Sequence, residues 1–375
     1  MKGESRSFNR IILIGNGFDL ALGLKTSYQD FIIWYIKELF KGSIKSNKQI
    51  VQKNFKTKYK IFDDELASVY MSNHYNNYDD ILSIIDSLDS YDSVLSIINV
   101  RKIFTLDIKS LLFKSIHNSS ISGWVDIESI YYKLLTQYID NNKAVIKLNN
   151  DLNFIKLKLE EYLNTINLND VLSNDNRKLF VHQFYDGIST SDVIDAKTEE
   201  FISRESIYCL NFNYTSSLKK VIESVEIKGT IPFQVNHIHG LLNSVNEKII
   251  FGFGDEMDKD YKNIENLNDN MYFEHIKSFN YFKNNNYRNL LSYLDSNDYQ
   301  VCIYGHSCGL SDRVMLNEIF EHDNCKSIKI YFYENENGEN DFTNKTMEIS
   351  RHFNSNKLMR RKIVDFNPTN KIPQL

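Results

Sequence analysis

Residues 11–19 read IILIGNGFD, an apolar run that ends in two closely spaced glycines. The four apolar residues predict a short buried strand, and the glycines permit a sharp turn directly after it. Residues 28–40 then repeat apolar side chains at helical spacing. A buried strand, a tight turn and a helix together form the opening unit of a parallel α/β sheet.

The second half of the chain repeats this alternation of strands and helices. Strand-like runs occupy residues 207–212, 234–237, 248–252, 299–304 and 327–333. Helical spacing covers residues 272–283, 287–294 and 312–321. This order predicts the α/β class, with a Rossmann-like, mainly parallel sheet that helices cover on both faces.

The middle of the chain differs from both ends. Residues 46–200 read as helix and loop without a strong strand, and examples of the predicted helices are 82–98, 127–138 and 153–163. We therefore expect a discontinuous α/β core, residues 1–45 and 201–375, with residues 46–200 as a large α-helical insertion.

The bulk composition is that of an ordinary globular protein. The chain has 375 residues, of which 42% are hydrophobic and 25% charged, and its formal net charge is −5. This balance gives no general attraction to nucleic acid, and the lysines between residues 37 and 60 are interpreted as a solvated helix surface. No apolar run approaches the roughly 20 residues of a membrane span, and residues 11–14 are too short for a signal-peptide core. The four cysteines form no closely spaced pair, so we expect no zinc site, no disulfides and a cytoplasmic location.

Two polar segments follow predicted strands, where an open parallel sheet binds its ligands. In Gly15–Asp19, the glycines and the following helix start could hold a phosphate. The third glycine of a dinucleotide fingerprint is missing, and a plain turn with Asp19 as helix cap is the alternative. In the second segment, Asn211 and Asn213 are two residues apart and could orient ribose hydroxyls or a water from one face, or form an ordinary Asn-rich turn.

The histidines of the segment HIHG, residues 237–240, are the next candidates. A metal would need a third ligand, which no neighbouring pattern supplies, so a metal is not expected. A neutral His239 acting as a general base is more economical, and His237 fits a hydrogen-bonded core histidine.

The segment Gly305–Gly309 matches G-x-S-x-G, the turn that presents the nucleophile of serine hydrolases. Asp341 and His352 follow in the order that such a triad needs. However, the next helix is predicted to begin near residue 312, whereas a nucleophile turn starts its helix at the serine. A Ser307 nucleophile would also leave the segments Gly15–Asp19 and Asn211–Thr215 without a role.

Taken together, these segments resemble the bacteriophage abortive-infection AbiH family from residue 11 to about residue 320. The resemblance rests on IILIGNGFDLALGLKTSYQDF (11–31), Trp124-Val125-Asp126-Ile127-Glu128, FNYT (212–215), HIHG (237–240), FGFGDE (251–256) and GHSCGLSD (305–312). More distantly, the chain resembles sirtuin-like NAD-consuming domains, whose catalytic histidine corresponds to His239. This chain departs from that pattern at Thr215, where an acid is usual, and at His306, where an aromatic residue is usual.

The resemblance implies a sirtuin-like core and an antiphage effector that hydrolyses NAD⁺ to nicotinamide and ADP-ribose. NAD⁺ is then the substrate, and no further cofactor is required. Asn213 would orient the ribose or a water, and His239 would act as the general base. The residues implied in NAD⁺ binding are Gly15, Asn16, Gly17, Phe18, Asp19, Tyr214, Gly305, His306, Ser307 and Asp312. The missing zinc-type cysteine pairs argue against a protein deacetylase.

Two other functions remain open at this stage. One is a non-catalytic sensor of NAD⁺ or ADP-ribose, and the other is a serine hydrolase that uses Ser307. The sequence leaves open a phage-derived trigger, self-association, and whether the product is linear or cyclic ADP-ribose. It also leaves open the roles of the helical insertion and of Trp124, Asp126 and Glu128.

Overall fold

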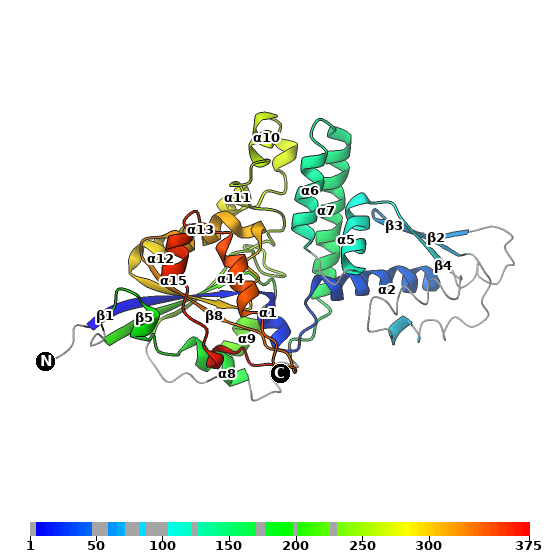
Figure 1. Cartoon of the computed structure of the whole chain (residues 1–375). Helices are drawn as coiled ribbons and strands as arrows, with labels where there is room; N and C mark the ends of the chain where they lie inside the picture. Colours follow the sequence, from blue (N-terminus) through cyan, green and yellow to red (C-terminus); the bar gives the residue numbers. More distant parts are fainter. Residues whose placement is uncertain are drawn as a thin grey trace. The chain divides into compact units, whose positions relative to one another are not determined.

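The computed structural model describes residues 5–46, 59–71, 83, 85–87, 104–121, 126–169, 177–197, 201–225 and 231–375 (Figure 1). The chain forms two compact units, and each is described by itself. Unit 1 comprises residues 1–25, 166–266 and 276–375, whereas unit 2 comprises residues 26–165 and 267–275. Among the described residues, no helix combines the length and the apolar composition that crossing a bilayer requires.

Unit 1 is built on a five-stranded sheet in the order β6-β5-β1-β7-β8, in which every pair of neighbours is parallel. Its strands are β1 (Ser5–Ile14), β5 (Phe201–Asn211), β6 (Phe233–His237), β7 (Tyr299–Tyr304) and β8 (Cys325–Tyr331). Strand β1, which contains the apolar run 11–14, lies in the centre between β5 and β7. The predicted α/β class and mainly parallel sheet are confirmed, whereas the sirtuin-like assignment stays a prediction.

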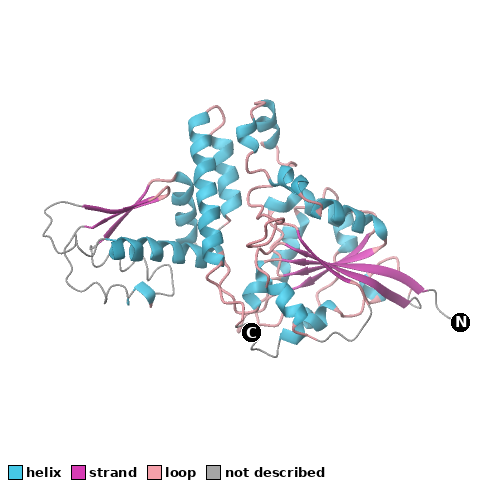
Figure 2. Ribbon diagram, turned by 180° about the vertical axis from the view of Figure 1, so that it is seen from behind, coloured by secondary structure: helices cyan, strands magenta, loops and turns pink. Residues whose placement is uncertain are grey.

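Both faces of this sheet are covered, as the unbroken apolar runs require (Figure 2). Ile11 and Leu13 pack in one buried cluster, and Ile12 and Ile14 pack in another on the opposite face. The helices that contribute to the first cluster are α12 (Asn286–Ser296), α13 (Arg313–Glu321), α14 (Phe342–Ser350) and α15 (Asn356–Lys362). Those of the second are α1 (Asn16–Ala21), α8 (Arg177–Phe184) and α9 (Ser217–Glu223). The four cysteines are buried and unpaired.

The remaining short elements of unit 1 connect this framework. They are η2 (Thr190–Asp192), α10 (Tyr261–Asn266), α11 (Lys277–Asn280), η4 (Tyr281–Lys283), η5 (Leu310–Asp312) and η6 (Pro368–Asn370). The prediction of a strand at 248–252 is wrong, because this segment bonds to a turn instead of a strand: Ile250 N–H donates to His239 O at 2.8 Å. The predicted helix 272–283 is also broken, since Ile276 is extended and Lys277 N–H donates to Phe253 O at 2.9 Å.

Unit 2 combines helices with a small antiparallel sheet. Its elements are α2 (Tyr28–Ser46), β2 (Tyr59–Asp63), β3 (Ala67–Met71), β4 (Phe104–Ile108), α5 (Leu111–Ile121), α6 (Ile127–Gln137), α7 (Asn142–Leu163) and η3 (Asn270–Phe273). The sheet has the order β2-β3-β4, so the prediction of an insertion without strands is wrong. Its strands have only five residues each, which is too short for a clear alternation of apolar and polar residues.

The unit boundaries also differ from residues 45 and 201. Helix α2 belongs to unit 2, where the Trp34 and Tyr162 rings lie 5.4 Å apart. Helix α8 belongs to unit 1, where Phe180 packs against Phe18. In the WVDIE motif, Asp126 caps α6 by accepting a hydrogen bond from Ser129 N–H at 3.0 Å, which gives this residue a structural role.

Some predictions lie outside the described residues. They concern Trp124 and Val125, almost all of the helix 82–98, and the lysines Lys48, Lys53, Lys56 and Lys58.

Candidate active site

The four segments singled out in the sequence follow β1, β5, β6 and β7. They therefore meet at the carboxyl ends of the parallel strands. Hydrogen bonds join neighbouring segments. Gly17 N–H donates to Gly305 O at 2.8 Å, and Asn213 Nδ2 donates to Gly15 O at 3.1 Å. Ile238 N–H donates to Asn211 O at 3.1 Å. The structure therefore brings the predicted segments together.

The glycines of the first and last segments permit direct backbone contact between them. A Cβ atom on Gly15 would lie 2.5 Å from His306 Cα, and one on Gly305 would lie 2.3 Å from Phe18 N. Gly305 also has a φ of +72°, which favours glycine. These glycines are explained by packing between the two segments, without a phosphate.

This packing limits the predicted phosphate site. Helix α1 has only six residues and begins at Asn16, which was predicted to lie in the turn. Phe18 N–H donates to Gly15 O at 2.9 Å, and Gly17 N–H is engaged with Gly305 O. The Phe18 ring is fully buried in the apolar cluster, which gives this side chain a role in packing, and its contact with a ligand stays a prediction. Asn16 is exposed at the outer rim of the segment.

Asp19 lies inside α1 and therefore does not cap it. Its carboxyl group is buried and accepts hydrogen bonds from Thr215 Oγ1, at 2.6 Å, and from Ser217 Oγ. Burial raises the pKa of Asp19 to about 6, although hydrogen bonds from Ser217, Thr215 and Asn213 act in the opposite direction. Thr215, which replaces the usual acid of the resembled pattern, is thus the partner of an acid in the first segment.

The amides at the end of β5 are held in fixed positions. Asn211 Oδ1 accepts from Asn213 N–H at 3.1 Å, and Asn211 Nδ2 lies 3.2 Å from His237 Nδ1. Burial lowers the pKa of His237. His237 is therefore a hydrogen-bonded core histidine, as predicted. Asn211 positions both Asn213 and His237.

His239 forms a buried polar cluster with Asp312 and Lys277. Its Nε2 lies 3.1 Å from Asp312 Oδ1 and 3.1 Å from Tyr281 Oη. Lys277 Nζ lies 3.0 Å from the same Asp312 oxygen, and the Lys277 side chain has no exposed surface. His306 Nε2 is 3.8 Å from Asp312 Oδ2. The carboxylate of Asp312 thus connects these three cationic or potentially cationic side chains, and its implied contact with NAD⁺ stays a prediction.

The charges in this cluster fix the protonation state of His239. Burial alone would raise the pKa of Asp312, but Lys277 and then His239 outweigh it and hold this pKa well below its usual range. An ionised Asp312 only accepts hydrogen bonds, so His239 Nε2 carries the proton and Nδ1 carries the lone pair. Burial, followed by the charge of Lys277, lowers the pKa of His239, which is therefore a neutral base at pH 7.

The His306 ring takes the place of an aromatic side chain. Its centroid lies 4.0 Å from that of Phe212, and the Phe212 centroid lies 5.0 Å from that of His239. His306 Nδ1 accepts from Cys308 N–H at 3.0 Å, and burial lowers the pKa of His306 to about 3. His306 therefore packs as a ring and also supplies an uncharged hydrogen-bonding group.

The arrangement around Ser307 is not that of a catalytic triad. Ser307 is exposed, and its hydroxyl makes no hydrogen bond to a histidine among the described residues. His352 Nε2 donates to Cys308 O at 2.7 Å, and Asp341 Oδ1 accepts from Tyr333 N–H at 2.7 Å. The positive φ in this turn belongs to Cys308 (+54°) and not to the serine.

Several site residues escaped the sequence reasoning. The helical spacing of residues 272–283 predicts Lys277 within a continuous helix, and nothing in the sequence ties it to Asp312, which lies 35 positions away. Asp255 of the FGFGDE segment is buried and pairs with Arg313 at 3.3 Å. Burial raises the pKa of Asp255. The FGFGDE motif was the available signal in the sequence, because it places the acid Asp255 directly after the glycines Gly252 and Gly254.

The described residues contain no group of three or more His, Cys, Asp or Glu side chains arranged to hold a metal ion. The two histidines considered as a chelate go to different partners, since His237 contacts Asn211 and His239 contacts Asp312.

These features define an α/β protein with a buried histidine–aspartate pair at the carboxyl edge of a parallel sheet. The family model for bacteriophage abortive infection AbiH matches residues 11–334. The chain therefore belongs to the AbiH family, which associates it with phage abortive infection. A comparison with curated proteins gives no match.

Proposed function

We propose that this protein acts in abortive infection by hydrolysing NAD⁺ to nicotinamide and ADP-ribose. The observation that carries the proposal is the buried His239, whose Nε2 lies 3.1 Å from Asp312 Oδ1 in a segment that is hydrogen-bonded to the one bearing Asn213. In the proposed reaction His239 would act as the general base, and Asn213 of the neighbouring segment would orient the ribose or a water.

The chemistry makes modest demands on the protein. Cleavage of the bond between nicotinamide and the ribose passes through an oxocarbenium-like centre, as in glycoside hydrolysis. Nicotinamide leaves as a neutral molecule and takes both electrons of the bond, so no strong acid is needed. A water oxygen bonds to the ribose carbon, and His239 Nδ1 accepts the water proton. The Asp312 carboxylate then stabilises the imidazolium.

The burial of these groups bears on how the activity would be controlled. Asn213, His239 and Asp312 are each less than 10% exposed, whereas Asn16, Ser307 and Leu310, in the segments that follow β1 and β7, are exposed. NAD⁺ would reach the buried pair of His239 and Asp312 only after the segments that follow β1 and β7 move. We therefore propose low activity in the resting protein and activation by a phage-derived trigger.

The direct test measures nicotinamide release from NAD⁺ by the full chain, with and without lysate of phage-infected cells as activator. We expect Asn213→Ala and His239→Ala each to lower the rate by about 10²–10⁴-fold, the usual loss when a positioned proton acceptor or its water is removed. His322→Ala is the matched control. His322 precedes β8 and therefore lies at the amino ends of the strands, whereas the candidate site lies at their carboxyl ends. Activity in neither condition, or full activity in both variants, would overturn the proposal. Binding of NAD⁺ without consumption would instead favour the sensor function.

Ser307 separates this proposal from a serine hydrolase. Because Ser307 is exposed and has no histidine partner among the described residues, we expect Ser307→Ala to raise KM for NAD⁺ more than it lowers kcat. A fluorophosphonate probe should leave Ser307 unlabelled, as peptide mass spectrometry would show. Labelling of wild type that disappears in Ser307→Ala would establish the nucleophile instead.

A further inference from the structure

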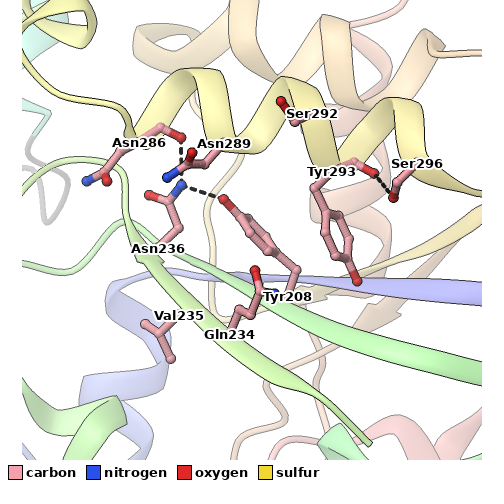
Figure 3. Close-up of a pocket in the computed structure, with 9 residues that line it drawn as sticks. All are labelled: Tyr208, Gln234, Val235, Asn236, Asn286, Asn289, Ser292, Tyr293 and Ser296. Carbon is pink, nitrogen blue, oxygen red and sulfur yellow. Dashed lines mark hydrogen bonds between the residues drawn. The ribbon is translucent and has the colours of Figure 1, made fainter.

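A cavity of about 330 Å³ lies along the edge strand β6, beneath α12 (Figure 3). This volume is at the lower end of the range for binding sites. The lining residues carry no formal charge at neutral pH, and most of them have an amide or hydroxyl group. They are Tyr208, Gln234, Val235, Asn236, Asn286, Asn289, Ser292, Tyr293 and Ser296. We call this cavity the β6 groove.

The two walls of the β6 groove are held together at one end. Asn236 Nδ2 donates to Tyr208 Oη at 2.5 Å and to Asn286 O at 2.7 Å. Figure 3 shows the side chains of Tyr208 and Asn236 pointing from the strands toward α12. Farther along, Gln234, Asn289 and Ser292 are exposed. Their polar groups therefore face a space that a ligand can enter.

The main chain of β6 has an open side next to this groove. Ile207 N–H donates to Pro232 O at 2.9 Å, and Ile238 N–H donates to Asn211 O at 3.1 Å. The N–H and C=O groups of successive residues point to opposite sides of a strand. Those of even-numbered residues in β6 therefore face β5. Those of Phe233 and Val235 face away from the sheet. Val235 is 36% exposed.

The other edge strand, β8, is protected, whereas no such protection of β6 is found among the described residues. Strand β8 carries Lys326 and Lys329, and a bridge at Ile363 covers it, with Val364 N–H donating to Ile328 O at 2.9 Å. Charges and covering segments are the usual protection of an edge strand. Strand β6 contains no Lys, Arg, Asp or Glu, and within the described ranges no strand or bridge pairs with its outer side.

We propose that β6 and the β6 groove bind an extended, uncharged segment of a partner polypeptide, which adds to the sheet beside β6. Peptide N–H and C=O groups of the segment would pair with the outward groups of Val235, and the neutral amides of the groove would bind its polar atoms. A charged side chain would find no partner of opposite sign among the lining residues, so its burial would be unfavourable. The inference does not depend on NAD⁺ chemistry.

The test selects peptides from a random display library on the immobilised full chain and measures their affinity by fluorescence anisotropy. We expect enriched peptides with an uncharged central segment. Val235→Pro should weaken their binding by about tenfold or more, because it removes the outward N–H of an edge strand that tolerates proline. Val235→Thr keeps this N–H and should bind as wild type does. Asn289→Arg, at an exposed helix position, should also weaken binding by filling the groove.

Three results would overturn the inference. The first is the absence of any peptide enriched over bare resin. The second is binding that Val235→Pro and Asn289→Arg leave unchanged while both variants melt as wild type does. The third is self-association of wild type, by analytical ultracentrifugation, that Val235→Pro abolishes, because the occupant would then be a second copy of this chain.

Discussion

Asp312→Ala is expected to lower the free energy of unfolding by about 3–5 kcal/mol, the usual cost of removing one partner of a buried ion pair. The Lys277 side chain has no exposed surface, and Asp312 is the carboxylate at its Nζ, 3.0 Å away. Without Asp312, this ammonium group would remain in the interior without its carboxylate, and His239 Nε2 would lose its acceptor. Urea denaturation at pH 7 measures the change.

A second substitution shows whether the isolated charge is the cause. In the double variant Asp312→Ala with Lys277→Met, the charge is replaced by an apolar side chain of similar length, so we expect most of the lost stability to return. Glu265→Ala is the control for an exposed pair, since Lys262 and Glu265 side chains are 76% and 40% exposed. That change should cost no more than about 1 kcal/mol. A double variant no more stable than Asp312→Ala would contradict this explanation.

The sequence was sufficient to predict the centre of the fold. The run Ile11–Ile14 and the strand at 299–304 are unbroken apolar segments, and this pattern is typical of strands buried on both faces. The position of the candidate site followed from topology alone, because the carboxyl ends of parallel strands lie on the same side of the sheet. Asn213, His239 and the Gly305–Asp312 segment could therefore be grouped without a structure.

The functions of individual side chains could not be predicted in the same way. Lys277 and Asp312 are brought together by tertiary packing, and an isolated lysine in sequence normally indicates an exposed residue. The glycines at 15 and 17 look like a phosphate-binding loop, but only the structure reveals the second backbone, at Gly305, that they contact. Ser307 matched a motif whose meaning depends on neighbours that were not visible in the sequence.

Asp19 gives the second large expected effect, a stability that falls between pH 4 and pH 7. Burial raises its pKa from 3.8 to about 6, so between these values the folded state binds more protons than the unfolded state. Stability therefore decreases as pH rises through this interval. Two pKa units correspond to about 3 kcal/mol, all of it present below pH 4 and lost above pH 6.

Asp19→Asn isolates this contribution, because an amide keeps the shape of the carboxyl group and does not titrate. The hydroxyls of Thr215 and Ser217, which donate to Asp19, can rotate to serve the amide. We expect the variant to lose stability relative to wild type at pH 4 but to gain relative stability by pH 7. The contributions of the other titrating groups cancel in the difference between the unfolding free energies of the variant and wild type. Asp365→Asn, at an exposed position, should follow wild type throughout.

The direction of the change decides between two roles for Asp19. A carboxylate that Thr215 and Ser217 stabilise in its ionised form would have a lowered pKa, and the relative stability of Asp19→Asn would then fall as pH rises. A buried acid that carries a proton near pH 6 would give the opposite trend. Because Asp19 links the first segment to the one bearing Asn213, a protonated Asp19 would also make the proposed hydrolysis of NAD⁺ depend on pH in this interval, and Asp19→Asn should remove that dependence.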